Sequence, residues 1–421
     1  MNIYIVTDSS TYEPRAELIL RYFADKGDNV TLIGTCFDHR KKRRRSDISE
    51  TDSIDDTGIR HIYLDAGGYK KNISPARLWY HHRFAKKAYR LLKELIIGES
   101  LIYLLLPGNS LAKVGARLKK ELNCRLIFDI IDLWPESLPV GGVEKTYPIR
   151  YWKKLRDDHL NAADHIVTEC ALYGDLLGLN KENISIMYWP KTEEVRLSDD
   201  KAYIPTESIY IAYLGSINNI IDIPLISEIL SEVNKRKHVI LEVIGNGEQA
   251  EAFTEALKNS GIEYQLHGAV FDEGKKQKIL QGCEWGINIM KPGVKVGLTM
   301  KSVEYMANGL RLINNIPGDT WDIVEGEHIG VNVGVKSIEV SADKALKDDV
   351  HSKIKADDTH ASKNERFKPP IASGKDAAEA AKLILRFTCA DRVQIHRLYE
   401  ERFSVRAMYE VLDEIRHLAI G

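Results

Sequence analysis

The sequence predicts an α/β protein made of two Rossmann-like domains that face each other, and three observations support this fold class. Its 421 residues exceed what one ordinary hydrophobic core holds, so two domains are expected. Short apolar runs alternate with amphipathic segments of helix length, which is typical of a parallel sheet covered on both faces. The alternation stops in the polar stretch 191–207, interpreted as an interdomain linker, and then restarts.

In the first domain, residues 1–190, each apolar run is followed by a segment long enough for the crossover that parallel strands require. The first such segment ends at Gly27, and glycine suits the left-handed position after a helix. The expected helices are 15–27, 76–98, 110–123 and 149–163, and the expected strands are 2–8, 29–34, 100–107, 124–132, 164–169 and 184–190.

The second domain, residues 207–399, repeats the same alternation. The charged segment 337–376 interrupts it and is interpreted as a helical or mobile insertion, and the tail 393–419 regains amphipathic helical spacing. The expected helices are 223–237, 249–261, 273–283 and 299–309, and the expected strands are 208–216, 238–247, 264–270, 284–290 and 310–316.

Composition argues against several classes of protein. Apolar residues make up 44% of the chain, which excludes wholesale disorder. The 59 basic and 61 acidic residues give a net charge of −2, which argues against a general nucleic-acid-binding surface. Five scattered cysteines argue for a reducing compartment and against a disulfide framework or a zinc ribbon. The first residues predict a strand and not a signal peptide, and no apolar run approaches the roughly 20 residues that span a bilayer, so a cytoplasmic location is expected.

The stretch GLTMKSVEYMANGLRLINN, residues 297–315, combines a helix start, two charges and a helix stop. Thr299 is expected to cap the helix and Gly309 to end it. The first turn then presents backbone amides at the positive end of the helix dipole, which suits a phosphate. Lys301 and Glu304 share one face, and a carboxylate one turn beyond a phosphate suits ribose hydroxyls. The alternative is a surface salt bridge on a packed helix.

Three turns of the second domain place glycine directly after an apolar strand: AYLGS, VIGNG and LHGAV. Glycine lets backbone amides approach a diphosphate or a base closely. The alternative is that these glycines serve only the turn between strand and helix. The candidate donor-binding residues in these turns are Gly215, Ser216, Gly245, Asn246, Gly268 and Ala269.

The order of these motifs, followed by an ERFS segment near the C-terminus, resembles the second half of GT-B glycosyltransferases of the family 4 type. In the first domain, DIIDLWPESL (129–138) is similar to a segment of their polysaccharide-assembly members. The resemblance implies transfer of a hexosyl group from a nucleoside-diphosphate sugar, with UDP as the expected nucleotide, to a glycan or lipid-linked acceptor in surface polysaccharide biosynthesis. It also implies retention of the anomeric configuration, no metal ion or cofactor, and a final helix near 400–421 that packs on the first domain.

The resemblance assigns donor-side roles as well. Glu304 matches the glutamate that binds the donor ribose, and the turn at Gly268 and Ala269 matches the strand end that contacts the base. The backbone amides around Thr299 and Met300 are then expected to hold the diphosphate.

On the acceptor side, Asp132 is the polar residue expected nearest to the reacting centre, as a general base or to orient the acceptor hydroxyl. The alternative is that Asp132 only caps the turn that follows it. The other acceptor-side candidates are Ser10, Thr11 and Arg15, at the exit of the first strand, and Glu136.

Three departures from the family pattern concern catalysis. Val296 stands where the family has the first glutamate of a pair, and Ile131 where it has His or Arg. Asn218–Asn219 stands where relatives carry Arg and Lys, although a departing diphosphate needs positive charge. The candidates for that charge are Lys291, Lys295 and Lys301.

These departures keep two other hypotheses open. One is a catalytically inactive GT-B subunit that binds glycan or a partner transferase. The other is a nucleotide-sugar epimerase with the same fold.

Two basic segments of the first domain concern partners. The run His39–Arg45 and the basic helix near 81–95 suit the anionic face of a membrane, where each cation contributes about 1 kcal/mol. A peripheral position on the inner face of the cell membrane is therefore one expectation. The alternative is a solvated loop beside an ordinary sheet-covering helix.

Overall fold

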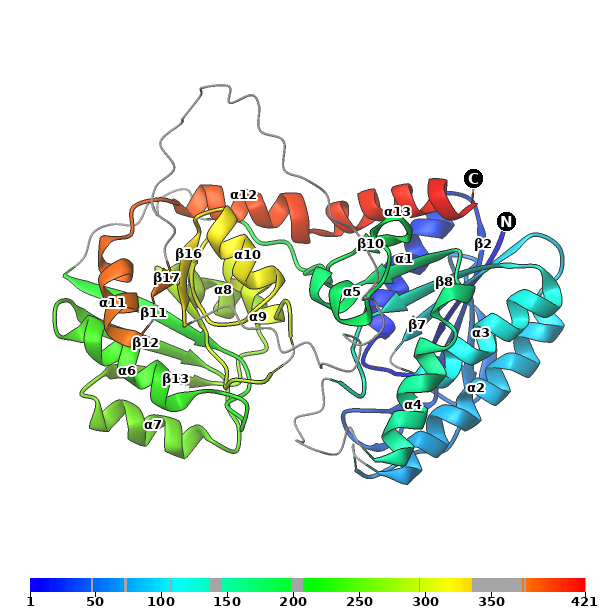
Figure 1. Cartoon of the computed structure of the whole chain (residues 1–421), viewed down its shortest axis with the longest axis horizontal. Helices are drawn as coiled ribbons and strands as arrows, with labels where there is room; N and C mark the ends of the chain where they lie inside the picture. Colours follow the sequence, from blue (N-terminus) through cyan, green and yellow to red (C-terminus); the bar gives the residue numbers. More distant parts are fainter. Residues whose placement is uncertain are drawn as a thin grey trace, which may run out of the picture. The chain divides into compact units, whose positions relative to one another are not determined.

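Two compact α/β units make up the chain (Figure 1). The computed structural model describes residues 1–46, 48–71, 74–106, 108–136, 146–197, 207–294, 296–334, 373–374 and 376–420. Unit 1 comprises Met1–Asp199, Val294–Gly309 and Val393–Gly421, and unit 2 comprises Asp200–Gly293 and Leu310–Arg392. Lys295 and nearly all of the predicted insertion 337–376 lie outside the described residues.

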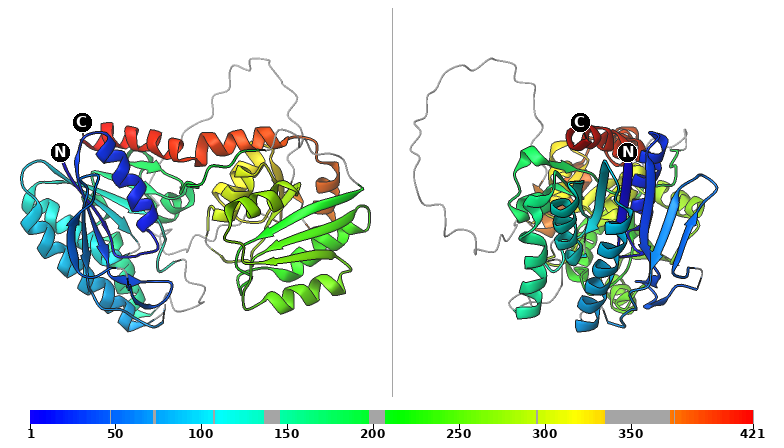
Figure 2. Two further views of the ribbon diagram at one scale, coloured as in Figure 1. Left: turned by 180° about the vertical axis from the view of Figure 1, so that it is seen from behind. Right: turned by 90° about the vertical axis from the view of Figure 1, so that its right-hand side faces the viewer.

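Among the described residues of unit 1, eight strands form one sheet in the order β10-β9-β8-β7-β1-β2-β6-β5 (Figure 2). Neighbouring strands run parallel, except that β5 pairs antiparallel with β6. The carboxyl ends of the parallel strands therefore meet at one edge of the sheet. The strands are β1 (Asn2–Thr7), β2 (Asn29–Thr35), β5 (Thr51–Ile54), β6 (Arg60–Leu64), β7 (Ser100–Leu106), β8 (Arg125–Ile130), β9 (His165–Thr168) and β10 (Ile184–Ile186).

Helices cover both faces of this sheet, as Figures 1 and 2 show. Apolar side chains of α2, α3 and α5 pack on one face, and those of α1 and α13 pack on the other. Every residue of β7 is buried, which explains its unbroken apolar run SLIYLLL. The helices are α1 (Glu13–Asp25), α2 (Pro75–Leu95), α3 (Asn109–Leu122), α4 (Tyr147–Asp157), α5 (Ala171–Leu177), α9 (Met300–Ala307), α12 (Arg392–Phe403) and α13 (Val405–Ile420).

Local sequence explains where several of these helices begin and end. The side chain of Ser74 accepts the backbone N–H of Arg77 and so caps α2. Asn123 ends α3 in the left-handed conformation, at a φ of +51°. Gly27 follows α1 at a φ of +81°, which confirms the predicted stop.

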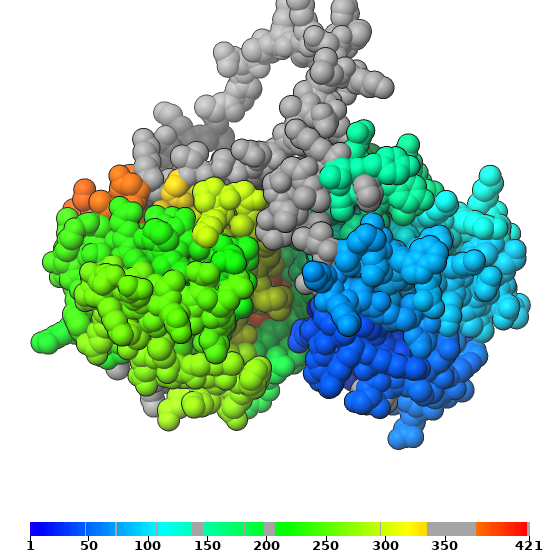
Figure 3. Space-filling model, turned by 90° about the horizontal axis from the view of Figure 1, so that it is seen from below, coloured from blue at the N-terminus to red at the C-terminus, as the bar shows by residue number. Residues whose placement is uncertain are grey.

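Seven parallel strands form the sheet of unit 2 within the described residues, in the order β13-β12-β11-β14-β15-β16-β17. Apolar residues of α6, α7 and α11 pack on one face of it. In Figure 3, most of the visible surface of this unit is green to yellow-green, and orange atoms from its later residues also lie on that surface. The strands are β11 (Ser208–Leu214), β12 (His238–Ile244), β13 (Glu263–Gly268), β14 (Trp285–Asn288), β15 (Arg311–Asn314), β16 (Gly330–Val333) and β17 (Ser373–Gly374), and the helices are α6 (Ile223–Asn234), α7 (Ala250–Asn259), α8 (Glu273–Gln281), α10 (Asp319–Gly326) and α11 (Ala377–Arg386).

The predicted fold class, α/β with two Rossmann-like domains, is confirmed. The domain boundaries differ from the prediction, because Val294–Gly309 and residues 393–399 group with unit 1 although the sequence placed both in the second domain. Residues 191–199 of the predicted linker also belong to unit 1. The short hairpin of β3 (Phe37–Asp38) and β4 (Arg43–Arg44) was not predicted. Its strands are too short and too polar to show an alternating apolar pattern.

None of the helices in the described residues combines the length and the apolar character needed to cross a membrane. Within the same residues, no group of three or more His, Cys, Asp or Glu side chains is arranged to hold a metal ion.

Candidate functional site

Helix α9 starts at a side-chain cap. The Thr299 Oγ1 accepts the backbone N–H of Ser302 at 3.2 Å, and the Thr299 backbone is extended, with φ −113° and ψ 145°. The chain leaves the helix through Gly309, whose φ of +69° is the left-handed conformation that glycine favours. The predicted cap and stop are therefore confirmed. The first turn, which begins at the exposed Met300, carries the positive end of the helix dipole.

Lys301 lies in that first turn and is half-buried. Burial lowers the pKa of its ammonium group from 10.5 to about 8. An ammonium group that has lost hydration gains more from a bound anion than a fully solvated one does. Lys301 and the helix start can thus act together on a phosphate.

Glu304, one turn further along α9, forms an ion pair that the sequence did not predict. The Lys191 Nζ lies 3.1 Å from Glu304 Oε2, and both side chains are largely buried, at 4% and 12% exposure. The Lys191 Nζ also lies 3.4 Å from a carboxylate oxygen of Glu193, whose side chain is half exposed. Tyr399 lies close by, and burial raises the pKa of its hydroxyl to about 12. Lys191 fell within the predicted linker, and the only signal for it was a cation directly after the apolar run ISIMYWP.

The three glycine turns of unit 2 contact one another through their backbones. The Gly215 N–H donates to the carbonyl of Ile244 at 2.9 Å, and the Gly245 N–H donates to the carbonyl of Gly268 at 2.8 Å. All three glycines have positive φ, and a Cβ atom on Gly245 would fall on the carbonyl oxygen of Gly215. Close backbone approach at the carboxyl ends of β11, β12 and β13 thus requires glycine. The neighbouring candidates Ser216, Asn246 and Ala269 are exposed.

The loop after β11 holds a network of polar side chains around Asn219, one of the two positions where the family that the sequence resembles carries cations. Asn219 donates to Glu248 at 2.6 Å and accepts from Gln249 at 2.8 Å. Lys291, a candidate for the missing charge, is exposed, and its backbone N–H donates to the carbonyl of Ile220. Lys295 lies outside the described residues. Of the other two candidate cations, Lys291 is exposed and Lys301 is half-buried beside the start of α9.

At the carboxyl edge of the unit 1 sheet, Asp132 lies beside an aromatic pair. The Tyr12 hydroxyl donates to Asp132 Oδ2 at 3.1 Å, and the Tyr12 and Trp189 ring centroids are 5.9 Å apart. Burial, and then the charge of Asp132, raise the pKa of Tyr12 well above its usual value. Asp132 keeps part of its surface exposed. A carboxylate held by a protonated phenol and open to solvent is suited to orient an acceptor hydroxyl or to take its proton.

A buried pair of histidines lies at the same edge, and the sequence gave no sign of it. The His81 Nδ1 lies 2.6 Å from Asp8 Oδ2, with both side chains fully buried. The His39 backbone N–H donates to Ser10 Oγ at 3.0 Å, so Ser10 is fixed by this cluster. The Arg77 guanidinium donates to His81 Nε2 and lies 3.6 Å from the centroid of the ring of Trp134. Burial lowers the pKa of His39 to about 3, so this imidazole is neutral.

Two acceptor-side predictions need correction or restriction. Arg15 is fully buried and forms a bidentate ion pair with Asp129, with N···O distances of 2.8 and 3.1 Å. Its guanidinium is therefore part of the core and does not face an acceptor. Glu136 pairs with the buried Arg156 at 2.6 Å and with Lys153 at 3.1 Å, and these ion pairs tie it to helix α4. Its acceptor role, like that of the half-buried Thr11, stays a prediction.

The sequence matches no family model and no curated protein. Its three-dimensional structure is similar to several solved ones. HepE from Anabaena in complex with UDP has a TM-score of 0.60 at 12% identity, covering 99% of both chains. Sucrose-phosphate synthase from Thermosynechococcus elongatus has a TM-score of 0.63 at 11% identity, covering 99% of this chain and 98% of that one. The lipopolysaccharide outer core galactosyltransferase WaaB has a TM-score of 0.59 at 12% identity, covering 98% of each.

The chain has the GT-B fold. The match extends over nearly the whole length of both chains, so the GT-B architecture includes both units and the C-terminal helices. At these identities the similarity concerns the fold, and a fold by itself does not determine function.

Proposed function

We propose that the protein is a glycosyltransferase that moves a hexosyl group from a nucleoside-diphosphate sugar to a glycan or lipid-linked acceptor. The observation that carries the proposal is helix α9, where a capped start, Lys301 and Glu304 follow one another within two turns. The GT-B fold and the family 4-type order of the motifs support it. UDP is the proposed nucleotide, since similar structures were solved with UDP and with UDP-glucose.

On the donor side, Glu304 is proposed to accept hydrogen bonds from the ribose hydroxyls, with Lys191 as a positioning residue that holds the carboxylate. Lys301 and the amides around Thr299 and Met300 would neutralise the diphosphate as it departs. This arrangement would replace the two cations that the loop at Asn219 lacks.

The glycine turns of unit 2 are proposed to contact the base and the donor phosphates. Their support is the position of Gly215, Gly245 and Gly268, each followed by an exposed residue, at the carboxyl ends of three adjacent parallel strands. That edge is where open α/β sheets bind their ligands.

On the acceptor side, Asp132 is proposed to orient the acceptor hydroxyl and to receive its proton. The bond between the anomeric carbon and the diphosphate oxygen breaks, a bond to the acceptor oxygen forms, and UDP leaves. The proposal also includes retention of the anomeric configuration and action in surface polysaccharide assembly. It further includes docking on an anionic membrane through His39–Arg45. Of these, membrane docking is supported by the exposed cations Arg40, Lys41, Arg43 and Arg44, whereas His39 is buried and neutral.

The test is calorimetric titration with UDP, GDP and dTDP of the wild type, of Glu304→Ala and of a control, Glu255→Ala, whose carboxylate is exposed on α7. We expect selective binding of UDP that weakens at least about tenfold in Glu304→Ala, since a charged hydrogen bond contributes about 1.5–3 kcal/mol. The control should bind like the wild type. A folded protein that binds none of the three nucleotides would instead favour a non-catalytic subunit.

A further inference from the structure

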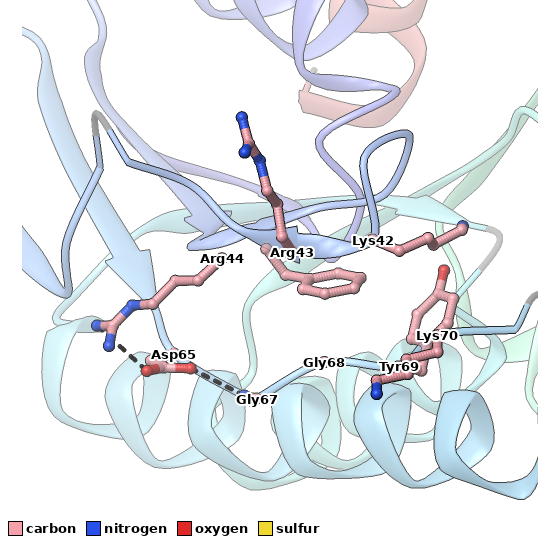
Figure 4. Close-up of a pocket in the computed structure, with 9 residues that line it drawn as sticks. Lys42, Arg43, Arg44, Asp65, Gly67, Gly68, Tyr69 and Lys70 are labelled. Atoms are coloured by element: carbon pink, nitrogen blue, oxygen red, sulfur yellow. Dashed lines mark hydrogen bonds and ion pairs between the residues drawn. The ribbon is translucent and has the colours of Figure 1, made fainter.

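A cavity of about 370 Å³ lies in unit 1, and neither α9 nor Asp132 lines it (Figure 4). The hairpin of β3 and β4 forms one wall and the loop after β6 forms the other. Its volume falls in the range of small-molecule sites. The lining residues are Phe37, Lys42, Arg43, Arg44, Asp65, Gly67, Gly68, Tyr69 and Lys70.

The cavity has an aromatic floor held in place by a glycine. Phe37 and Tyr69 are both almost fully buried, with ring centroids 5.1 Å apart. A Cβ atom on Gly68 would collide with the Phe37 ring, so only glycine allows this ring to lie against the loop. The floor is therefore apolar and closely packed.

Positive charge around the cavity exceeds what the protein neutralises. Arg44 is paired with Asp65 at 3.2 Å, and Figure 4 shows its guanidinium turned toward that carboxylate. Among the described residues, no carboxylate forms an ion pair with Lys42, Arg43 or Lys70. The four cations against one carboxylate leave the lining with a net charge of +3.

Lys42 is held over the cavity by a strained turn. Its φ of +53° is a conformation in which glycine or asparagine is preferred, yet the hairpin uses a lysine. The Asp38 carboxylate fixes the turn by accepting the N–H groups of Arg40 and Lys41, each at 2.9 Å. The Lys42 Nζ then lies 4.8 Å from the centroid of the Tyr69 ring (Figure 4). Strain of this kind at a non-glycine residue points to a function of the side chain.

The charge of Lys42 is also poorly compensated by its surroundings. Burial, and then the nearby positive charge of Arg77, lower its pKa, and the opposing effect of Asp38 is smaller. The Arg77 guanidinium lies 5.5 Å from the centroid of the Tyr69 ring, on which Lys42 also lies. An added anion would relieve the repulsion between these two cations.

We infer that this cavity binds a phosphate group, with Lys42 and Lys70 as its principal cations. The phosphate belongs either to a soluble sugar phosphate or to a lipid headgroup, and both present the same group to the cavity. If the protein is the glycosyltransferase proposed above, this site is a handle for a phosphate-bearing acceptor. Binding itself does not depend on that activity.

The test measures binding of inorganic phosphate, of glucose 6-phosphate and of phosphatidylcholine vesicles with and without phosphatidylglycerol. The key variant is Lys42→Gly, because glycine relieves the strained turn and the protein should fold with an unchanged or higher Tm. Lys42→Gln and Lys70→Gln remove each charge in turn. The matched control is Lys41→Gln, since Lys41 is exposed on the same hairpin, lies outside the cavity and carries the same charge.

We expect binding to weaken about fivefold for each cavity cation removed and to remain unchanged in Lys41→Gln, since one cation near a phosphate contributes about 1 kcal/mol. Binding of glucose 6-phosphate would identify a soluble ligand, and binding only to vesicles that contain phosphatidylglycerol would identify a lipid. Equal losses in Lys41→Gln and Lys42→Gln would mean diffuse surface charge and would overturn the inference, as would wild-type binding in Lys42→Gly or no binding of any probe. Titration of the same samples with UDP tests the proposed transferase separately.

Discussion

The Lys191 ammonium group lies 3.1 Å from the Glu304 carboxylate, and little of either side chain reaches solvent. These residues are more than a hundred positions apart in the sequence, and the ion pair joins the segment after β10 to helix α9. It fixes the carboxylate that the proposed function assigns to the donor ribose. Substitutions of Lys191 can therefore test both the stability of this ion pair and its proposed role in donor binding.

Lys191→Met should leave the Glu304 carboxylate largely buried without its ammonium partner. We expect the free energy of unfolding to fall by about 2–3 kcal/mol, because losing a charged hydrogen bond in a largely buried site costs that much. UDP affinity should fall together with it, since the carboxylate loses its fixed orientation. Denaturant unfolding and calorimetry measure the two effects. Glu193→Gln changes only the exposed carboxylate near Lys191 and should leave both the free energy of unfolding and the UDP affinity unchanged. Lys191→Arg should retain part of the stability and part of the UDP affinity.

Lys301 should make donor binding depend on pH. Its pKa of about 8 means that the ammonium group loses its proton as pH rises through 8, so affinity for UDP-glucose should decline above that pH. UDP-glucose is the suitable titrant because its diphosphate has no terminal phosphate that titrates in this range. Lys301→Met should bind more weakly and show no such decline. A wild-type affinity that stays constant between pH 7 and pH 10 would contradict the assigned role.

The same lysine should affect stability in the opposite direction. In the unfolded chain its pKa returns to about 10.5, so between pH 8 and 10.5 the unfolded state binds more protons than the folded one. The contribution of Lys301 to the free energy of unfolding should therefore rise with pH across this window when no ligand is bound. The comparison that isolates it is the pH dependence of unfolding in the wild type minus that in Lys301→Met. A difference that falls with pH would show that burial does not lower this pKa.

Asp132→Asn should lower kcat without weakening the binding of UDP, because the carboxylate is proposed to act on the acceptor. A general base contributes about 10²–10⁴-fold to rate. Tyr12→Phe removes the hydrogen bond at 3.1 Å and should lower kcat by about tenfold or less. UDP release with the identified donor sugar and acceptor measures both variants. A residue that only caps its turn would reduce stability in both variants while kcat per folded molecule stays the same.

Arg15 should matter for stability and not for binding. Arg15→Met leaves the buried Asp129 without its partner, and we expect a loss of about 3–5 kcal/mol in the free energy of unfolding of unit 1. The double variant Arg15→Met with Asp129→Leu should recover much of that loss, because replacing a whole buried ion pair is often neutral. UDP affinity of the folded fraction should not change. Weaker acceptor binding without lost stability would restore the acceptor role that the structure argues against.

Gly245→Ala should disrupt the turns of unit 2. The added methyl group would collide with the carbonyl oxygen of Gly215, and the φ of +152° disfavours any side chain. Gly261→Ala is the matched control, because Gly261 has a φ of +64° with open space around it and should lose only about 1 kcal/mol. Thermal unfolding measures both variants, and a larger loss of Tm in Gly245→Ala than in Gly261→Ala reports the steric clash beyond the backbone strain. Equal losses in the two variants would mean that the turns move apart easily.

Sequence patterns predicted the local features because these depend on neighbouring residues. The cap at Thr299, the stop at Gly309 and the alternation of strand and helix all follow from short-range geometry and apolar periodicity. The same patterns failed for Arg15, whose position at a helix start did not reveal that Asp129 lies beneath it. They also failed for the β3–β4 hairpin, where two-residue strands show no period.

The sequence by itself thus determined the fold class, the limits of most helices and strands, and the residue types available for phosphate and ribose contacts. Only the tertiary structure decided which polar and charged side chains contact one another. Lys191 forms an ion pair with Glu304, and Asp8 contacts His81. Lys42 lies over the ring of Tyr69 at the cavity. The physical reason is that a charge is stabilised or left uncompensated by groups within a few ångströms in space, and chain folding brings those groups together from distant positions.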